Sequence, residues 1–117
     1  MEIAGLRDAK GVVRLCLTSR ADDFPDCKKS GAVSGWVKAG GGTLVYTFHN
    51  VAPGTYAIAA FHDANGNNKL DTSLGIPREG FAFSRNPAMR PRAPRFNETS
   101  FAAGPQSVQR LQMRYLL

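Results

Sequence analysis

The stretch GVVRLCLT, residues Gly11–Thr18, decides the fold class of this 117-residue chain. In it, Val13, Leu15 and Leu17 occupy every second position. This period of two is typical of a β-strand that buries one face and leaves the other wet. No segment of eleven or more residues shows the periodicity of a helix, so the chain is predicted to be all-β.

Four further runs are strand-like, at residues 32–38, 43–48, 56–62 and 107–116. The turn signals GGG at 40–42 and APGT at 52–55 separate consecutive runs, which predicts a meander over residues 32–62. Short strands at this spacing indicate one antiparallel β-sandwich of the immunoglobulin-like or transthyretin-like kind. The length fits a single domain that spans residues 1–117.

The segment from about 71 to 101 differs from the rest of the chain. It contains four prolines, lacks sustained alternation and carries the aromatic residues Phe81, Phe83, Phe96 and Phe101. Connections of this length in a small domain are usually functional or disordered. Because a solvated linker seldom carries so many aromatic rings, we expect one long ordered loop across the sandwich.

The composition is that of a folded globular protein, with 43% hydrophobic and 21% charged residues. No apolar run approaches the 18 residues that a membrane span needs, so no span is expected. The net charge of +6 is concentrated after residue 77, where the chain has seven arginines and two acidic residues. A basic segment of this kind attracts anions in general.

Four arginines of this segment are candidate ligand-binding residues, alone or with the neighbouring phenylalanines: Arg85, Arg90, Arg92 and Arg95. Their partner would be an anionic polysaccharide, a lipid or a small molecule. No nucleic-acid-binding motif accompanies them, so specific nucleic-acid binding is not expected. The alternative interpretation is a solvated basic loop.

Two cysteines, Cys16 and Cys27, stand eleven positions apart. A disulfide between them would close a short loop and would indicate an oxidising compartment. The alternative is two unpaired thiols. The spacing is too wide for a redox Cys-x-x-Cys pair, and two cysteines with two distant histidines make a weak zinc signature.

The stretch FHDANGNNKLD, residues 61–71, has the ligand spacing of an EF-hand-type calcium loop. With the first aspartate as position 1, positions 1, 3, 5, 7 and 9 are Asp63, Asn65, Asn67, Lys69 and Asp71. Position 7 needs only a backbone carbonyl, so a lysine is compatible there. Position 12 is Leu74 in place of the bidentate glutamate, and Glu79 is the nearest downstream carboxylate that could replace it.

Two other interpretations of this stretch remain open. Asn, Asp and Gly are the commonest turn residues, so DANGNN is also compatible with a plain hydrogen-bonded turn. His62 with Glu79 could serve an enzyme, but a lone histidine at a strand end is more often packed or hydrogen-bonded. No GxSxG, HExxH or phosphate-binding glycine loop is present, so we expect no enzymatic activity.

The segment PGTYAIAAFHDANGNNKLD, followed by GIPREGFAFS, resembles an uncharacterised family of small secreted bacterial proteins, a domain of unknown function. Its members pair a strand ending in His-Asp with an Asn- and Gly-rich loop and a Gly-Ile-Pro-x-Glu-Gly segment. The resemblance implies a transthyretin-like or carboxypeptidase-regulatory-like β-sandwich that is exported through a signal peptide. Matching positions are His62, Asp63, Asn65, Asn67, Lys69, Asp71, Gly75, Pro77, Glu79 and Gly80.

The leading hypothesis is therefore a non-catalytic β-sandwich of the periplasm or cell exterior. In it, calcium bound by residues 63–71, the Asp/Asn loop, organises the long segment that follows. The alternative hypothesis is a binding module that uses the arginines and phenylalanines of residues 81–101.

Overall fold

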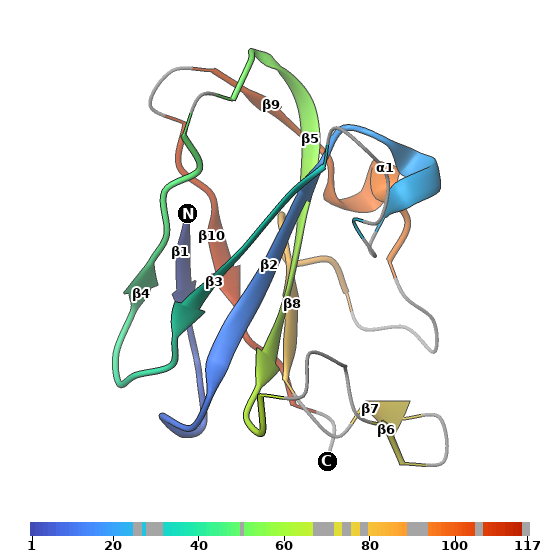
Figure 1. Ribbon diagram of the computed structural model, residues 1–117. Coiled ribbons are helices and arrows are strands. Elements are labelled where there is room, and N and C mark those ends of the chain that lie inside the picture. The colour runs from blue at the N-terminus through green and yellow to red at the C-terminus, as the bar shows by residue number, and fades with distance from the viewer. Residues whose placement is uncertain are drawn as a thin grey trace.

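Two β-sheets face each other in the computed structural model of the chain (Figure 1). The structure describes residues 1–24, 27, 32–49, 51–66, 72–73, 76–77, 80–88, 94–104 and 107–115. Within these ranges the regular structure is mostly β-strand, so the predicted all-β sandwich is confirmed.

The larger sheet is built on β2 (Val12–Thr18) and β5 (Gly54–Asp63), which pair antiparallel over seven residues. The edge strand β3 (Val33–Lys38) pairs with β2, and β8 (Phe81–Phe83) pairs with the second half of β5. The first half of β5 pairs instead with β9 (Phe101–Ala103). The strand GVVRLCLT thus lies in the middle of this sheet, as its alternation predicts.

The smaller sheet has the order β10-β1-β4. Its central strand β1 (Glu2–Ala4) runs parallel to β10 (Arg110–Gln112) and antiparallel to β4 (Leu44–Val45). The two sheets are joined at one edge, where Phe81 and Arg114 exchange two backbone hydrogen bonds of 3.0 and 2.9 Å.

The hydrophobic core lies between the sheets. From β2 the alternate residues Val13, Leu15 and Leu17 point inward, and they meet Ile3 and Leu111 from the smaller sheet. All five side chains are at most 3% exposed, so the period of two in the sequence corresponds to the inner face. On the outer face of β2, Cys16 and Thr18 are buried as well.

The predicted meander over residues 32–62 is wrong. β3 pairs with β2, β4 pairs with β1 in the other sheet, and β5 returns to the opposite side of β2. Consecutive strands in this stretch are therefore never neighbours. The turn signals mark where the chain reverses, but they do not determine which sheet it enters next.

The segment from 71 to 101 is more than a loop. It supplies β8 to the larger sheet, a short hairpin of β6 (Thr72–Ser73) with β7 (Ile76–Pro77), and the single helical turn α1 (Phe96–Thr99). α1 and the 3-10 turn η1 (Ala21–Asp23) lie on the side of the larger sheet away from the smaller one (Figure 1).

The outer face of the larger sheet carries the disulfide and a cluster of aromatic rings. Cys16 and Cys27 are bonded, with their Cα atoms 5.7 Å apart. Next to them, Phe24 lies 5.9 Å from Phe83 and 6.2 Å from Phe96 between ring centroids. The disulfide and the contacts between the phenylalanine rings together hold η1 and α1 against the sheet.

Replacing both cysteines by alanine should lower the free energy of unfolding by about 2.5 to 3 kcal/mol, because a closed loop of this size limits the entropy of the unfolded chain. Urea denaturation measures the difference. Dithiothreitol should destabilise the native protein by a similar amount and leave the double variant unchanged. An equal effect of the reductant on both would contradict the disulfide as its cause.

Candidate functional site

The candidate site lies where β5 ends and the Asp/Asn loop begins. In the register of β2 with β5, His62 faces Val13 and Asp63 faces Val12. Successive strand residues point to opposite faces. The His62 ring therefore enters the space between the sheets, while the Asp63 carboxylate lies on the outer face.

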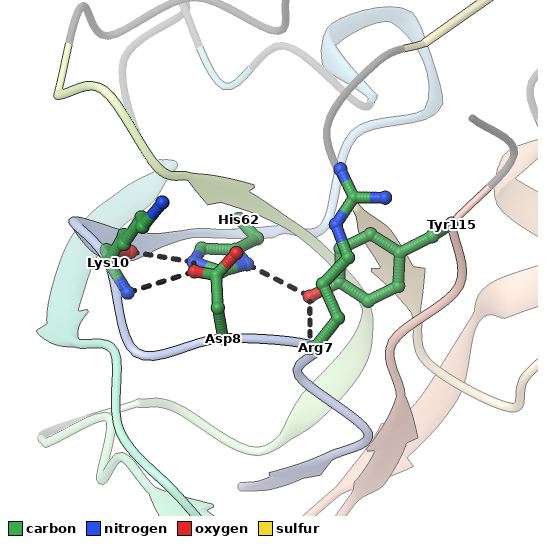
Figure 2. Close-up of polar contacts among 5 residues, drawn as sticks. All are labelled: Arg7, Asp8, Lys10, His62 and Tyr115. Carbon is green, nitrogen blue, oxygen red and sulfur yellow. Dashed lines mark hydrogen bonds and ion pairs between the residues drawn. The ribbon is translucent and has the colours of Figure 1, made fainter.

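His62 is 2% exposed, and both of its ring nitrogens have partners (Figure 2). Nε2 lies 2.7 Å from the backbone carbonyl of Lys10, and Nδ1 lies 2.9 Å from the hydroxyl of Tyr115. The imidazole therefore joins β5 to the segment after β1 and to the segment after β10.

The partners define how the protons are arranged. A carbonyl oxygen only accepts, so Nε2 donates to Lys10. In the neutral ring Nδ1 then accepts from the Tyr115 hydroxyl, whose oxygen accepts the backbone N–H of Arg7 at 3.1 Å. Every polar group in this chain of hydrogen bonds is satisfied, which is what a buried polar network requires.

Asp8 borders this network. Its Oδ1 accepts the backbone N–H of Lys10 at 2.9 Å and lies 3.6 Å from Nε2 of His62. An aspartate, a histidine and a tyrosine are thus close together, as in many catalytic sites. A general base must reach a substrate proton, however, and the buried His62 ring has both nitrogens engaged by the protein itself. The geometry fits a structural junction between three segments.

The Tyr115 ring contacts Arg7 and Gly80. The Arg7 guanidinium lies 4.4 Å above the centroid of its ring. At Gly80 an added Cβ would lie 2.5 Å from a ring carbon of Tyr115, so a larger residue there would displace the ring. The glycine that ends the GIPREG segment therefore has a packing role in this structure.

Asp63 forms an ion pair on the outer face. Its Oδ2 accepts Nε–H of Arg14 at 2.7 Å, and the Asp63 side chain is fully buried. Beneath this pair, Gly11 adopts a positive φ of 67°, and a Cβ there would lie 2.1 Å from the Asp63 carbonyl oxygen. The first predicted calcium ligand is thus fixed by an arginine and by close backbone contact.

The loop after Asp63 turns at once. Asn65 is exposed, and Gly66 has a φ of 70°, a conformation that glycine adopts without strain. The chain returns to the end of β5 at Gly80, whose carbonyl accepts the backbone N–H of His62 at 2.8 Å. The other predicted ligands, Asn67, Lys69, Asp71 and Glu79, lie outside the described residues.

Within the described part of the chain, no three His, Cys, Asp or Glu side chains are grouped so that they could hold a metal ion. Asp63 is the one charged residue of the predicted ligand set that the structure describes. No described helix is long and apolar enough to cross a membrane.

Two of the four candidate ligand-binding arginines are described, and both are exposed. Arg85 places Nη1 3.4 Å from the carbonyl of Ser100, at the end of α1. Arg95 precedes α1, and its backbone N–H donates to Glu98 Oε1 at 2.8 Å. The structure thus brings Arg85 and Arg95 to the same helical turn. Arg90 and Arg92 lie outside the described residues.

The model of one protein family, described as "Uncharacterized protein conserved in bacteria (DUF2141)", matches residues 1–110. The chain belongs to this family. The resemblance inferred from the sequence is thereby confirmed at the level of an uncharacterised bacterial family. No curated protein and no solved structure matches the chain.

In this DUF2141 chain, sequence reasoning missed the partners of His62. Two of its contacts involve Lys10 and Tyr115, which are 52 and 53 positions away in sequence. The Lys10 partner is a backbone carbonyl, which no side-chain pattern reports. The one available signal in the sequence was Tyr115, which continues the alternation of Leu111 and Met113.

Replacing Tyr115 by phenylalanine should lower the free energy of unfolding by about 1 to 3 kcal/mol, because Arg7 N–H and His62 Nδ1 both lose their partner. Urea denaturation measures the loss. Tyr56→Phe is the matched control, since its hydroxyl donates a single hydrogen bond of 2.8 Å to Ala52 at an exposed site. Equal losses in the two variants would contradict a network centred on Tyr115.

The same variant should change the response to pH. Burial raises the pKa of the Tyr115 hydroxyl above its ordinary value, and the contacts with Arg7 offset only part of that rise. The folded state then holds this proton more tightly than the unfolded state. The stability that Tyr115 contributes is therefore fully present below about pH 10 and is lost as the pH rises further. The stability difference between the native protein and Tyr115→Phe should shrink above pH 10, as measured by urea denaturation at each pH.

Proposed function

We propose that this chain is a non-catalytic β-sandwich that binds calcium through the loop that begins at Asp63. The proposed ligands are the side chains of Asp63, Asn65, Asn67 and Asp71, the carbonyl of Lys69 and the carboxylate of Glu79. Calcium takes six to eight oxygen ligands, and this set is composed of oxygen donors alone.

The observation that carries the proposal is the closure of the loop. His62 donates its N–H to the Gly80 carbonyl at 2.8 Å, and Phe61 pairs with Phe81 in the sheet. The chain thus leaves and re-enters the sheet at neighbouring positions. All the proposed ligands lie in sequence between these two anchors, which limits the entropy that an ion must overcome to gather them.

The position of Asp63 supports the proposal. Arg14 donates to its Oδ2 at 2.7 Å, which holds the first proposed ligand at the end of β5. Arg14 and the close contact with Gly11 also fix the start of the loop, so that Asp63 is ordered before any ion arrives.

We further propose that the protein is exported to the periplasm or the cell exterior and has a transthyretin-like or carboxypeptidase-regulatory-like sandwich. The Cys16–Cys27 disulfide supports export, because such bonds persist in oxidising compartments. The signature of residues 53–84 supports the sandwich type. Free calcium outside the cytosol suits a site of 0.1 to 1 mM affinity, roughly the range of extracellular modules.

Calcium should raise the melting temperature of chelator-treated protein by about 5 to 10 °C at about 10 mM, because an ion that binds only the folded state stabilises it by mass action. Thermal unfolding followed by circular dichroism measures the shift. Asn65→Ala and Asp71→Asn should each remove more than half of it. Asp22→Asn is the matched control, since Asp22 pairs with Arg20 at an exposed site away from the loop.

Two results would contradict calcium binding: a melting temperature that does not respond to calcium, or an equal response in the loop variants and the native protein. Isothermal titration calorimetry provides a second readout, because it measures the dissociation constant and the number of calcium ions bound directly. Magnesium at the same concentration tests whether the loop prefers the larger ion.

A second proposal is an anionic ligand on the arginines of residues 81–101, supported by the exposed side chains of Arg85 and Arg95 beside α1. Binding of heparin, an acidic polysaccharide, should weaken about tenfold or more when sodium chloride rises from about 0.05 to about 0.2 M. Arg90→Gln with Arg92→Gln should weaken it further, whereas Arg20→Gln should not. Binding that responds to neither salt nor the double variant would rule out this surface.

A further inference from the structure

A cavity of about 370 Å³ opens between the two sheets, near the strand β9 and far along β5 from the Asp/Asn loop. Its floor is formed by the core residues Leu17 and Ile58, its walls include Phe48 and Phe101, and Val45 and Val108 stand among its lining residues. The cavity therefore reaches the hydrophobic core from the surface.

The volume is that of a small-molecule pocket, because such pockets begin at about 300 Å³. Val45 and Val108 are 65% and 50% exposed, and they are two of the four large apolar side chains that are exposed in the described part of the chain. Their exposure costs free energy, and a ligand that covers them would recover part of it.

The lining also indicates the charge of the ligand. Glu2 contributes the one acidic or basic side chain among the described lining residues, and its Oε1 lies 3.5 Å from Arg110 Nε. Met1 also lines the cavity and carries the N-terminal ammonium, which donates to the Tyr46 carbonyl at 2.8 Å. The other polar contributions come from Thr47, Ser107 and Gln109. No arginine or lysine stands among the described lining residues, and the charges of Glu2 and of the Met1 ammonium offset each other, so this lining has no net positive charge to hold a carboxylate or a phosphate. A carboxylate near Glu2 would meet a like charge in a largely apolar site.

We propose that this cavity binds a small uncharged lipid-like molecule, such as a medium-chain alcohol. The apolar body would lie against Leu17, Ile58 and the two phenylalanine rings. The polar end would face the hydroxyl and amide groups of the lining. This site is separate from the proposed calcium loop, since β5 runs from Gly54, which pairs beside the cavity-lining Ala103, to Asp63 at the other end of the strand.

Fluorescence of the neutral dye N-phenyl-1-naphthylamine tests the proposal on the full chain. Its emission should rise with saturation at one dye per protein, and 1-decanol should displace it. Decanoate should displace it at least about tenfold less effectively at neutral pH, because the described lining has no net positive charge to offset a buried carboxylate. Equal or better displacement by decanoate would overturn the assignment of an uncharged ligand.

Variants locate the site. Ala103→Phe fills the cavity and should weaken dye binding by about tenfold or more. Val108→Glu, at a half-exposed position that tolerates a charge, should weaken it without unfolding the chain. Trp36→Ala is the matched control, because Trp36 is 60% exposed on the outer face of β3 and would bind dye if exposed apolar surface alone were responsible.

Three results would overturn the proposal: no saturable binding, unchanged binding in folded Ala103→Phe and Val108→Glu, or loss of binding in Trp36→Ala. The response of the melting temperature to calcium distinguishes a failure of this proposal from a failure of the proposed calcium binding. The cavity variants should keep the calcium-dependent rise in melting temperature, and the loop variants should keep dye binding.

Discussion

The antiparallel pairing of β2 with β5 is the constraint on which the rest of the structure depends. Seven residues of β2 are in register with β5, from Val12 opposite Asp63 to Thr18 opposite Ala57. A shift of one residue would turn every side chain of one strand to the other face. Burial of Val13, Leu15 and Leu17 forbids that shift, and so it also fixes that His62 points inward and Asp63 outward.

The two faces at the end of β5 have different consequences. Inside, the His62 imidazole joins segments on either side of the core through Lys10 and Tyr115. Outside, Asp63 pairs with Arg14 and starts the Asp/Asn loop. The His-Asp pair of the signature therefore combines a junction that closes the sandwich with an anchor that positions the loop. A catalytic interpretation is not needed to explain why these two residue types stand side by side.

The sequence predicted those elements whose pattern is local. Alternation in Gly11–Thr18 identified the central strand, and the spacing of Cys16 and Cys27 allowed the bond that the structure contains. The partner of β4 was not predictable. Its pairing with β1 joins segments about 40 residues apart, and no local sequence pattern reports which sheet the chain enters after residue 42. β8 was missed because three residues are too few to show alternation.

The candidate site was predictable in part and for a similar reason. The ligand spacing from Asp63 is a local pattern and gives a testable hypothesis, although most of those residues lie outside the described part of the chain. The partners of His62 and the ion pair of Asp63 come from distant positions, so no local pattern reports them. The same holds for the cavity, whose lining comes from β1, β2, β4, β5, β9 and the connections between them.

The parallel pairing of β1 with β10 has a consequence for the route by which the chain folds. Glu2 pairs with Arg110, and the Arg7 N–H reaches Tyr115 at a separation of 108 positions. Contacts of such high contact order form late, because nearly the whole chain must be closed into a loop before they are gained. A nascent chain therefore cannot complete the smaller sheet until residue 110 has been made. During synthesis β1 therefore stays without one of its two neighbours in the smaller sheet until β10 is available.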